Sequence, residues 1–297
     1  MNTFLRFLFA TINVILFAMI SLICATLVYV GGVLLLLTPF RQPRWHLTKL
    51  LLNMPALWSQ AVNGLLFMAT RHKWIIQRHA SLDRNQWYVL ISNHQTWADI
   101  SVLGYVLSQH IPVFKFFMKK QLLWGLPFIG VATWILGYPF MARHTREQIR
   151  KNPKLKGKDV EIAKRCCRKF LEHPTTVINF VEGTRFTMEK HERQHSPFKH
   201  LLKPKAGGVA IVINELQEKL AGIINVTIRY TESNMTFWKL LSGNFEKIIV
   251  TYDFIPVTEA LYGDYYKDRQ FRSHFQQWLN GVWQEKDDSL DKPLKTS

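Results

Sequence analysis

Residues 87–99 read WYVLISNHQTWAD, a short apolar run that leads into a polar turn. The first six, Trp87 to Ser92, are the apolar and β-branched residues typical of a buried strand. Helical periodicity begins at about Asp99. The polar residues in between, which include His94, are therefore predicted to form a strand-to-helix turn.

The same alternation continues along the chain. Four more apolar runs predict strands, at Val113 to Met118, Thr176 to Val181, Leu220 to Tyr230 and Lys247 to Val257. Helical patterns are found at Asp99 to His110, Gly130 to Leu136, Asp159 to Glu172, Gly207 to Gln217 and about Asp264 to Glu285. Strands that alternate with helices predict the α/β fold class, with a sheet covered on both faces.

The N-terminal segment has a different composition. Residues 7–40 carry no charged side chain, and a helix that spans a membrane needs roughly 20 apolar residues. No small-residue cleavage site ends the run, so an uncleaved membrane anchor is predicted. Two arrangements are open: the helix tilts to absorb its excess length, or Gly31-Gly32 breaks it and leaves Val33 to Phe40 shallow or re-entrant.

Charges beside the anchor predict its orientation. Arg41, Arg44 and Lys49 follow it, whereas Arg6 and the amino terminus precede it. The positive-inside bias therefore places the downstream domain in the cytoplasm, on the inner (plasma) membrane.

A second apolar segment runs from Trp45 to Thr70. Its polar residues Lys49, Asn53, Gln60 and Asn63 recur at helical spacing. The stripe suits an amphipathic helix at the membrane interface and equally a helix packed on the domain core. The predicted organisation is an anchor (1–40), an amphipathic interfacial helix and linker (41–80), an α/β domain (81–285) and a polar C-terminal tail (286–297).

Composition narrows the class of protein. The 297 residues include 38 Lys+Arg and 21 Asp+Glu, a net charge of +17 with 48% hydrophobic residues, which excludes a disordered chain. Three cysteines without a CxxC pair predict neither a disulfide framework nor a structural metal, and they fit a reducing compartment.

The histidines His191, His195 and His200 lack the spacing of metal ligands and are expected at the surface. The basic stretch 150–169 is either a solvated helix face or a patch held to anionic headgroups.

His94 and Asp99 are the first candidates for chemistry. On a continuous helix, side chains five residues apart diverge by about 140°, so the two meet only if the turn folds the chain back. If they meet, the carboxylate fixes the imidazole tautomer and stabilises imidazolium. The other ring nitrogen can then take a proton from a hydroxyl, as a general base does.

Three further blocks place charged groups just after apolar, strand-like stretches. They are Lys119-Lys120 with Pro127 and Gly130, the run PFMAR that ends at Arg143, and the run INFVEGTR that ends at Arg185. In the last block, Gly183 lets backbone N–H groups approach an anion, and Arg185 can grip a phosphate with two hydrogen bonds.

Together these residues resemble the lysophosphatidic acid acyltransferase family, which belongs to the glycerophospholipid acyltransferases. The blocks occur in the family's order, the match covers about Trp87 to Tyr230, and NHxxxxD with a downstream EGTR is a specific combination. The runs FVEGTRFT, PKAGG and NVTIRY are more similar to the lysocardiolipin-acyltransferase-like branch. The resemblance implies a glycerolipid acyltransferase-type αβ domain behind a two-helix, membrane-associated start.

The resemblance also implies roles for individual residues. His94 would be the general base that deprotonates the acceptor hydroxyl, with Asp99 as its partner. The phosphate and glycerol of the acceptor would be bound by Glu182, Gly183, Thr184, Arg185, Arg143 and Lys119. An acyl thioester is already activated, so no enzyme nucleophile is needed, and Cys166 and Cys167 should be dispensable.

The expected function is transfer of a fatty acyl group from acyl-CoA or acyl carrier protein to the free hydroxyl of a lysophospholipid. 1-Acyl-glycerol-3-phosphate, which would give phosphatidic acid, is the leading acceptor. A basic protein suits these phosphate-bearing partners and an anionic membrane surface; no cofactor, metal or nucleic acid is expected. The alternatives are another acceptor (lysocardiolipin, lysophosphatidylglycerol or a lipid A precursor), or a non-catalytic membrane lipid-binding scaffold.

Overall fold

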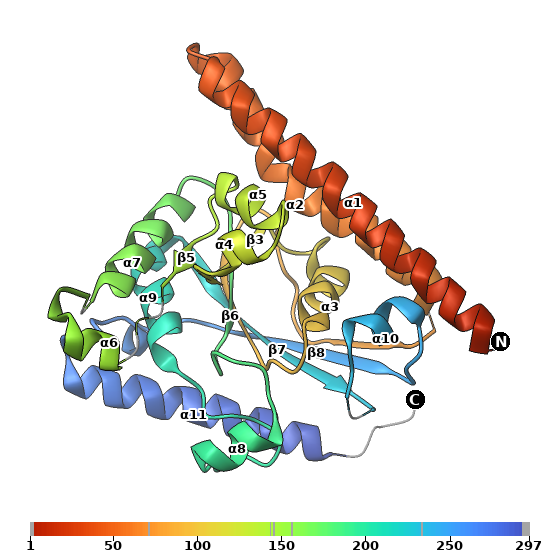
Figure 1. Ribbon diagram of the computed structural model, residues 1–297. Coiled ribbons are helices and arrows are strands. Elements are labelled where there is room, and N and C mark those ends of the chain that lie inside the picture. The colour runs from red at the N-terminus through yellow and green to blue at the C-terminus, as the bar shows by residue number, and fades with distance from the viewer. Residues whose placement is uncertain are drawn as a thin grey trace.

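The computed structural model describes residues 3–70, 72–142, 144, 146–155, 157–232 and 234–292. Its centre is a six-stranded sheet (Figure 1). The strands, in their order across the sheet, are β1 (Trp74–Arg78), β8 (Ile248–Ile255), β7 (Leu220–Tyr230), β2 (Trp87–Ser92), β6 (Thr176–Phe180) and β3 (Phe114–Phe116). A separate pair of short strands, β4 (Met118–Lys119) and β5 (Phe140–Met141), lies beside it.

Strand direction gathers the chain's functional turns at one edge. Strands β3, β6, β2 and β7 are parallel, so their carboxyl ends lie at the same edge of the sheet. Strand β8 is antiparallel to β7, and β1 is parallel to β8. Ligands of open α/β sheets bind outside the carboxyl ends of parallel strands, so the turns after β2 and β6 are well placed for a site.

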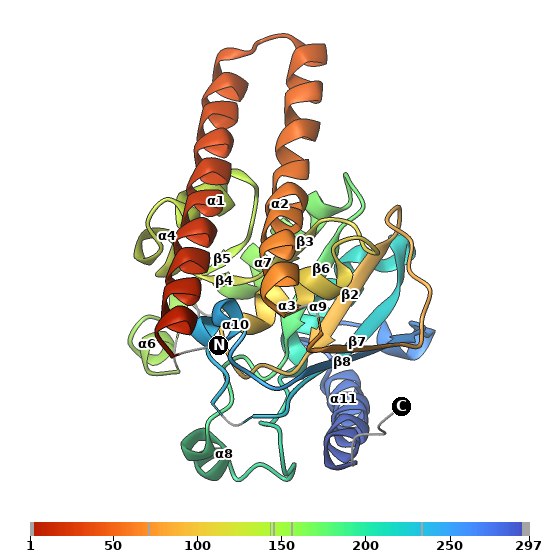
Figure 2. The same cartoon turned by 90° about the vertical axis from the view of Figure 1, so that its right-hand side faces the viewer.

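Helices cover both faces of the sheet, as the alternating pattern predicted (Figure 2). One face packs on α7 (Lys158–Phe170), α9 (Ala206–Leu216) and α11 (Arg269–Asp291). The other packs on α2 (Arg41–Thr70), α3 (Ala98–Leu107) and α10 (Phe237–Ser242). The remaining helices are α1 (Thr3–Leu37), α4 (Leu122–Gly125), α5 (Ile129–Ile135), α6 (Arg146–Lys151) and α8 (Met188–Gln194), and 3-10 turns cover Pro153–Leu155, Gln217–Lys219 and Glu259–Leu261.

Helices α1 and α2 form an antiparallel hairpin that lies along the domain and projects beyond it (Figures 1 and 2). Near the amino terminus, the Asn13 side chain donates to the carbonyl of Leu241. Farther along, the Trp58 indole donates to Ser21. The amino terminus and the domain therefore lie at the same end of the hairpin.

The first helix does not break at its glycine pair. It continues through Gly31-Gly32 to Leu37, which excludes the broken-helix arrangement. A Cβ atom on Gly31 would lie 2.6 Å from a methyl carbon of Leu51, so this glycine allows α1 and α2 to pack closely. Within the described part of the chain, one helix is long enough and apolar enough to cross a membrane, and it is Phe7–Leu37.

The second helix is packed on the domain core in its C-terminal half. Val62, Leu65 and Leu66 are buried against the sheet and α3. Asn63, one residue of the predicted polar stripe, donates to the carbonyl of Gly104 in α3 and to the hydroxyl of Ser108, the residue after α3. This half of α2 is therefore packed on the domain core, one of the two arrangements that the stripe allowed. The other residues of the stripe are exposed, and they are Lys49, Asn53 and Gln60.

The structure corrects two predicted boundaries. The segment assigned to a linker before residue 81 contains β1, which pairs with β8 along its whole length. The predicted tail at 286–297 begins inside α11, which continues to Asp291 and buries Lys286, Asp287 and Leu290. The domain thus extends beyond 81–285 in both directions because these residues complete its sheet and its helical layer.

The close approach of the start of α5 to α4 depends on Gly130. A Cβ atom at this position would lie 2.3 Å from the carbonyl oxygen of Leu123 and 2.5 Å from that of Leu122, and backbone atoms cannot yield cheaply. Gly130→Ala is expected to destabilise the protein by about 1–3 kcal/mol, as overpacking does. The measurement is thermal unfolding in detergent, with Gly125→Ala, whose Cβ would meet nothing within 4 Å, as the control. Equal melting temperatures for the two variants would contradict this assignment.

Candidate active site

Strand register brings the two sequence motifs together. Ser92 at the end of β2 is opposite Phe180 at the end of β6, so His94 and Glu182, each two residues farther on, leave the sheet side by side. The backbone N–H of His94 donates to Oε1 of Glu182 at 3.0 Å. The ring of Phe180 stacks on the His94 imidazole with 4.1 Å between centroids. The register of two parallel strands thus builds the site.

His94 and Asp99 are in direct contact. Nδ1 of His94 donates to Oδ2 of Asp99 at 2.8 Å. The same oxygen accepts the backbone N–H groups of Gln95 at 2.6 Å and Thr96 at 3.0 Å, and these bonds fold the turn back onto the start of α3. Asp99 is 0% exposed. Because Nδ1 is engaged, Nε2 is the nitrogen of His94 left to exchange a proton.

Tyr230, at the end of β7, completes the surroundings of Asp99. Its hydroxyl donates to Oδ1 of Asp99 at 2.6 Å, across 131 residues of sequence. Burial, and then the charge of Asp99, raise the pKa of Tyr230 well above its usual value, so the phenol keeps its proton and remains a donor. Sequence reasoning did not select Tyr230, although the run NVTIRY that ends there was among the motifs that carried the resemblance.

Glu182 lies beneath the site rather than on its surface. It is 0% exposed, and Oε2 accepts the backbone N–H of Leu202 at 3.1 Å while Oε1 accepts that of His94. Burial raises the pKa of Glu182, and these two hydrogen bonds oppose that rise. The carboxylate joins two backbone segments, and it does not line the cavity beside His94.

The other predicted binding residues surround a cavity of about 240 Å³ that His94 lines. Lys119, Gly183, Thr184 and Arg185 all line it. The Arg185 guanidinium lies 5.0 Å from the centroid of the Trp97 ring. Gly183 has φ +71°, the left-handed region that glycine adopts without strain. Arg143, the remaining predicted residue, lies outside the described residues.

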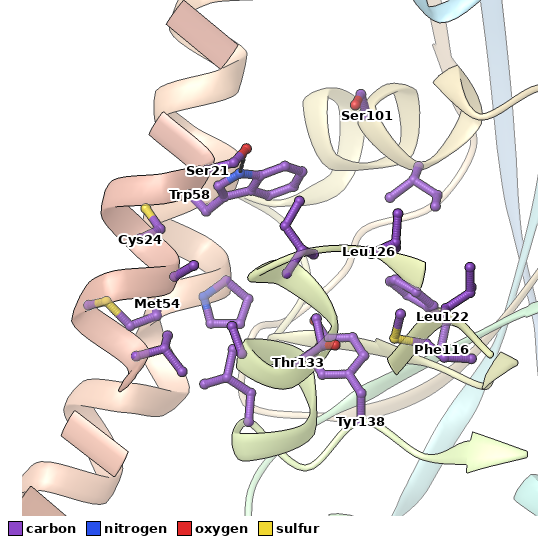
Figure 3. Close-up of a pocket in the computed structure, with 18 of the residues that line it drawn as sticks. Ser21, Cys24, Met54, Trp58, Ser101, Phe116, Leu122, Leu126, Thr133 and Tyr138 are labelled. Atoms are coloured by element: carbon purple, nitrogen blue, oxygen red, sulfur yellow. Dashed lines mark hydrogen bonds between the residues drawn. The ribbon is translucent and has the colours of Figure 1, made fainter. Parts of the chain in front are cut away.

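An apolar cavity of about 380 Å³ adjoins this polar one (Figure 3). Its far side is formed by α1 and α2, which contribute Ser21, Cys24, Met54 and Trp58 to its lining. The two cavities share the lining residues Trp97, Ile100, Phe116, Met118 and Leu122. An apolar cavity and a cationic one that His94 lines therefore adjoin each other.

The remaining reactive side chains lie elsewhere. Cys167 of α7 is buried in the core, and burial raises the pKa of its thiol above the ordinary range. The ring of His191 contacts the carbonyl of Phe198, and that of His200 contacts Asp291. Among the residues that the structure describes, no three His, Cys, Asp or Glu side chains are grouped to hold a metal ion.

This fold and site define the class: an α/β protein with a His–Asp pair after its second strand and a polar cavity that joins an apolar one. The family model named Acyltransferase matches residues 73–230, more than half of the chain. The protein belongs to the Acyltransferase family, as the motifs predicted.

Curated relatives are distant. An uncharacterized acyltransferase of Saccharomyces cerevisiae is 25% identical over 70% of this chain and 59% of its own length. 1-Acyl-sn-glycerol-3-phosphate acyltransferase 3 of Arabidopsis thaliana is 26% identical over 54% of this chain and 43% of its own length. The chain therefore spans less than two thirds of either relative.

A solved structure has the same fold. It is the 1-acyl-sn-glycerophosphate acyltransferase PlsC of Thermotoga maritima, which aligns over 97% of this chain and 100% of its own with a TM-score of 0.52. The sequence identity is 14%, so the likeness is one of fold. It includes the N-terminal helices as well as the α/β domain.

Tyr230→Phe removes the donor to Oδ1 of Asp99 and leaves the ring in place. A hydrogen bond to a charged group contributes about 1.5–3 kcal/mol, so the acyl-transfer rate expected of the family should fall about 10- to 100-fold. The control is Tyr88→Phe, a buried tyrosine whose hydroxyl accepts the N–H of Asp83. Equal rates for the two variants would show that Tyr230 has no part in holding Asp99.

Proposed function

We propose that this protein transfers a fatty acyl group from a thioester, acyl-CoA or acyl carrier protein, to the free hydroxyl of a lysophospholipid. 1-Acyl-glycerol-3-phosphate, which yields phosphatidic acid, is the proposed acceptor. The observation that carries the proposal is the His94–Asp99 pair at the junction of a polar cavity and an apolar one. One space suits a phosphate-bearing headgroup, and the other suits an acyl chain.

In the proposed reaction, His94 is the general base. Nε2 takes the proton of the acceptor hydroxyl while the hydroxyl oxygen attacks the thioester carbonyl. The thiolate of the donor then leaves. Asp99 holds the imidazole by Nδ1 and stabilises the imidazolium that forms. The stacked ring of Phe180 keeps the imidazole from turning away. The acyl group passes directly from the sulfur of the thioester to the oxygen of the acceptor, so the buried Cys167 has no part.

The acceptor phosphate is assigned to the cationic end of the polar cavity. Arg185 and Lys119 line this end together with Gly183, whose own N–H donates to the carbonyl of Phe180. A guanidinium binds phosphate with two parallel hydrogen bonds, and the lysine adds a second positive charge. Glu182 supports this end from below by holding the backbone of His94.

The acyl chain is assigned to the apolar cavity. Its volume of about 380 Å³ falls within the range of ligand pockets, about 300–1,000 Å³. Almost all of its lining side chains are apolar, so a chain that leaves water for this cavity gains about 0.8 kcal/mol for each CH₂ group buried.

We also propose that the protein works at the inner membrane with its domain on the cytoplasmic face. Support comes from the large apolar side chains that α1 exposes, among them Phe4, Phe7, Ile15, Leu36 and Leu37. A surface of this kind favours lipid over water. Since α1 and α2 also line the apolar cavity, an acyl chain held there stays close to the bilayer.

The test is transfer of a labelled acyl group from acyl-CoA to a panel of lysophospholipids in membranes. His94→Ala should reduce the rate by about 10²–10⁴-fold, the usual contribution of a general base, and leave membrane association intact. The control is His274→Ala, an exposed histidine on α11. An undiminished rate in His94→Ala would place the base elsewhere. If wild-type protein gave no product with acyl-CoA or acyl carrier protein donors, the scaffold alternative would replace the enzyme.

A second test concerns the acyl cavity. Ala25→Leu adds a larger side chain to the lining contributed by α1, so the longest donors should lose at least about tenfold in kcat/KM. Short-chain donors should react within about twofold of wild type. The control is Ala18→Leu, two turns earlier on α1 and outside the cavity lining. An unchanged chain-length profile would contradict the assignment.

A further inference from the structure

Helix α11 has a charged side chain at a core position. Its buried residues recur at helical spacing and are Phe275, Leu279, Val282, Trp283, Lys286, Asp287 and Leu290. Lys286 is 2% exposed. Burying an ammonium group costs several kcal/mol unless partners compensate for the lost water, so the contacts of Lys286 bear on its role.

Lys286 contacts β7 where β2 ends. Its ammonium donates to the carbonyl of Val226 at 2.5 Å and to the hydroxyl of Thr227 at 3.0 Å. Val226 is the register partner of Ser92, which is two residues before His94. The amide of Asn93 then exchanges two hydrogen bonds with Ile228. Lys286 thus binds the part of β7 that is hydrogen-bonded to the start of the turn containing His94.

Asp287, the next residue, holds a different segment. Its carboxylate accepts the backbone N–H groups of Lys199 at 2.6 Å and His200 at 2.8 Å. Two residues on, the N–H of Leu202 donates to Glu182. Residues 199–202 therefore connect α11 to the carboxylate that accepts the N–H of His94.

The charges of Lys286 and Glu182 act on each other. Burial lowers the pKa of Lys286 and raises that of Glu182. The positive charge of Lys286 acts against the rise at Glu182, and the negative charge of Glu182 acts against the fall at Lys286. Asp99 also raises the pKa of Glu182, and Asp253 of β8 raises that of Lys286. The ammonium of Lys205 lies close to Gly183, beside Glu182.

We propose that α11 positions the catalytic histidine from the far face of the sheet, with Lys286 and Asp287 as positioning residues that act through β7, residues 199–202 and Glu182. This inference rests on the proposed function. Neither residue lines the polar or the apolar cavity, so neither touches substrate. Helix α11 lies beyond residue 230, where the family match ends, so Lys286 and Asp287 are outside the matched motif blocks.

Burial raises the pKa of Glu182 to about 8, and the ammonium of Lys286 acts against this rise. The lysine therefore favours the ionised form of Glu182, in which each oxygen accepts one N–H group. A protonated carboxyl carries a hydrogen on one oxygen, and that oxygen no longer accepts well from an N–H that faces it. Loss of the bond to His94 would let the imidazole shift, and a displacement of about 1 Å can cost about 10²-fold in rate. The lysine thus favours the form of Glu182 that makes both hydrogen bonds.

The experiment is Lys286→Met in the full-length protein, which removes the ammonium and keeps an unbranched side chain. At about pH 8, where Glu182 titrates in the wild type, kcat should fall about 10- to 100-fold and KM should stay within about threefold. Because the pKa of Glu182 rises when the ammonium is lost, the acid limb of the kcat profile should move to higher pH, and activity should recover as the pH is raised. Glu285→Gln, an exposed neighbour on α11, is the control and should behave as wild type.

The double variant Lys286→Met/Glu182→Gln separates positioning from a general loss of folding. If Lys286 acts through the charge of Glu182, the double variant should be as active as Glu182→Gln alone, because no carboxylate remains to be protonated. Independent losses that multiply, with a melting temperature that falls in parallel, would overturn the proposal, as would an unchanged kcat in Lys286→Met.

Hydrogen exchange provides a readout that does not depend on activity. The amide of His94 donates to Glu182, so the peptide that contains residues 93–97 should exchange faster in Lys286→Met and not in Glu285→Gln. If wild type transfers no acyl group but this difference is seen, the proposed function fails and the positioning role stands. If exchange is the same in all three proteins, the positioning role fails whatever the activity.

Discussion

The parallel pairing of β2 with β6 is the constraint on which the site depends. Because Ser92 faces Phe180, the turns that follow put His94 beside Glu182, and the aromatic ring at the end of β6 stacks on the imidazole. Strand β7, on the other side of β2, adds Tyr230 to the same edge. Three strands from distant parts of the sequence thus supply the base, its supports and its surroundings.

Two buried carboxylates give this site its rigidity. Asp99 and Glu182 are both 0% exposed, and each accepts two backbone N–H groups. Asp99 also accepts from the side chains of His94 and Tyr230. Buried charges are tolerated when each lone pair has a donor, and a satisfied network has one favoured geometry. A fixed imidazole between an apolar cavity and a cationic one is what acyl transfer to a phosphate-bearing acceptor requires.

Sequence predicted the parts of this structure that depend on local pattern. The run 87–92 forms β2 as expected because its side chains are apolar and β-branched. Edge strand β1 was missed because Trp74–Arg78 is short and only partly buried. Whether His94 meets Asp99 depends on backbone bonds in the turn, which spacing does not reveal. Lys286 and Asp287 were assigned to a tail because their polarity conceals that they are buried.

A photoreactive acyl-CoA, with a diazirine at the end of its chain, would test whether the two cavities form one active site. Peptide mapping after irradiation should find the label on the lining residues of α1 and α2, near Cys24–Val28 and Met54–Trp58, and unlabelled acyl-CoA of the same length should compete it away. Label that accumulates on the basic surface of α7, or that resists competition, would contradict the account, because the acyl chain would then lie outside the cavity that adjoins His94.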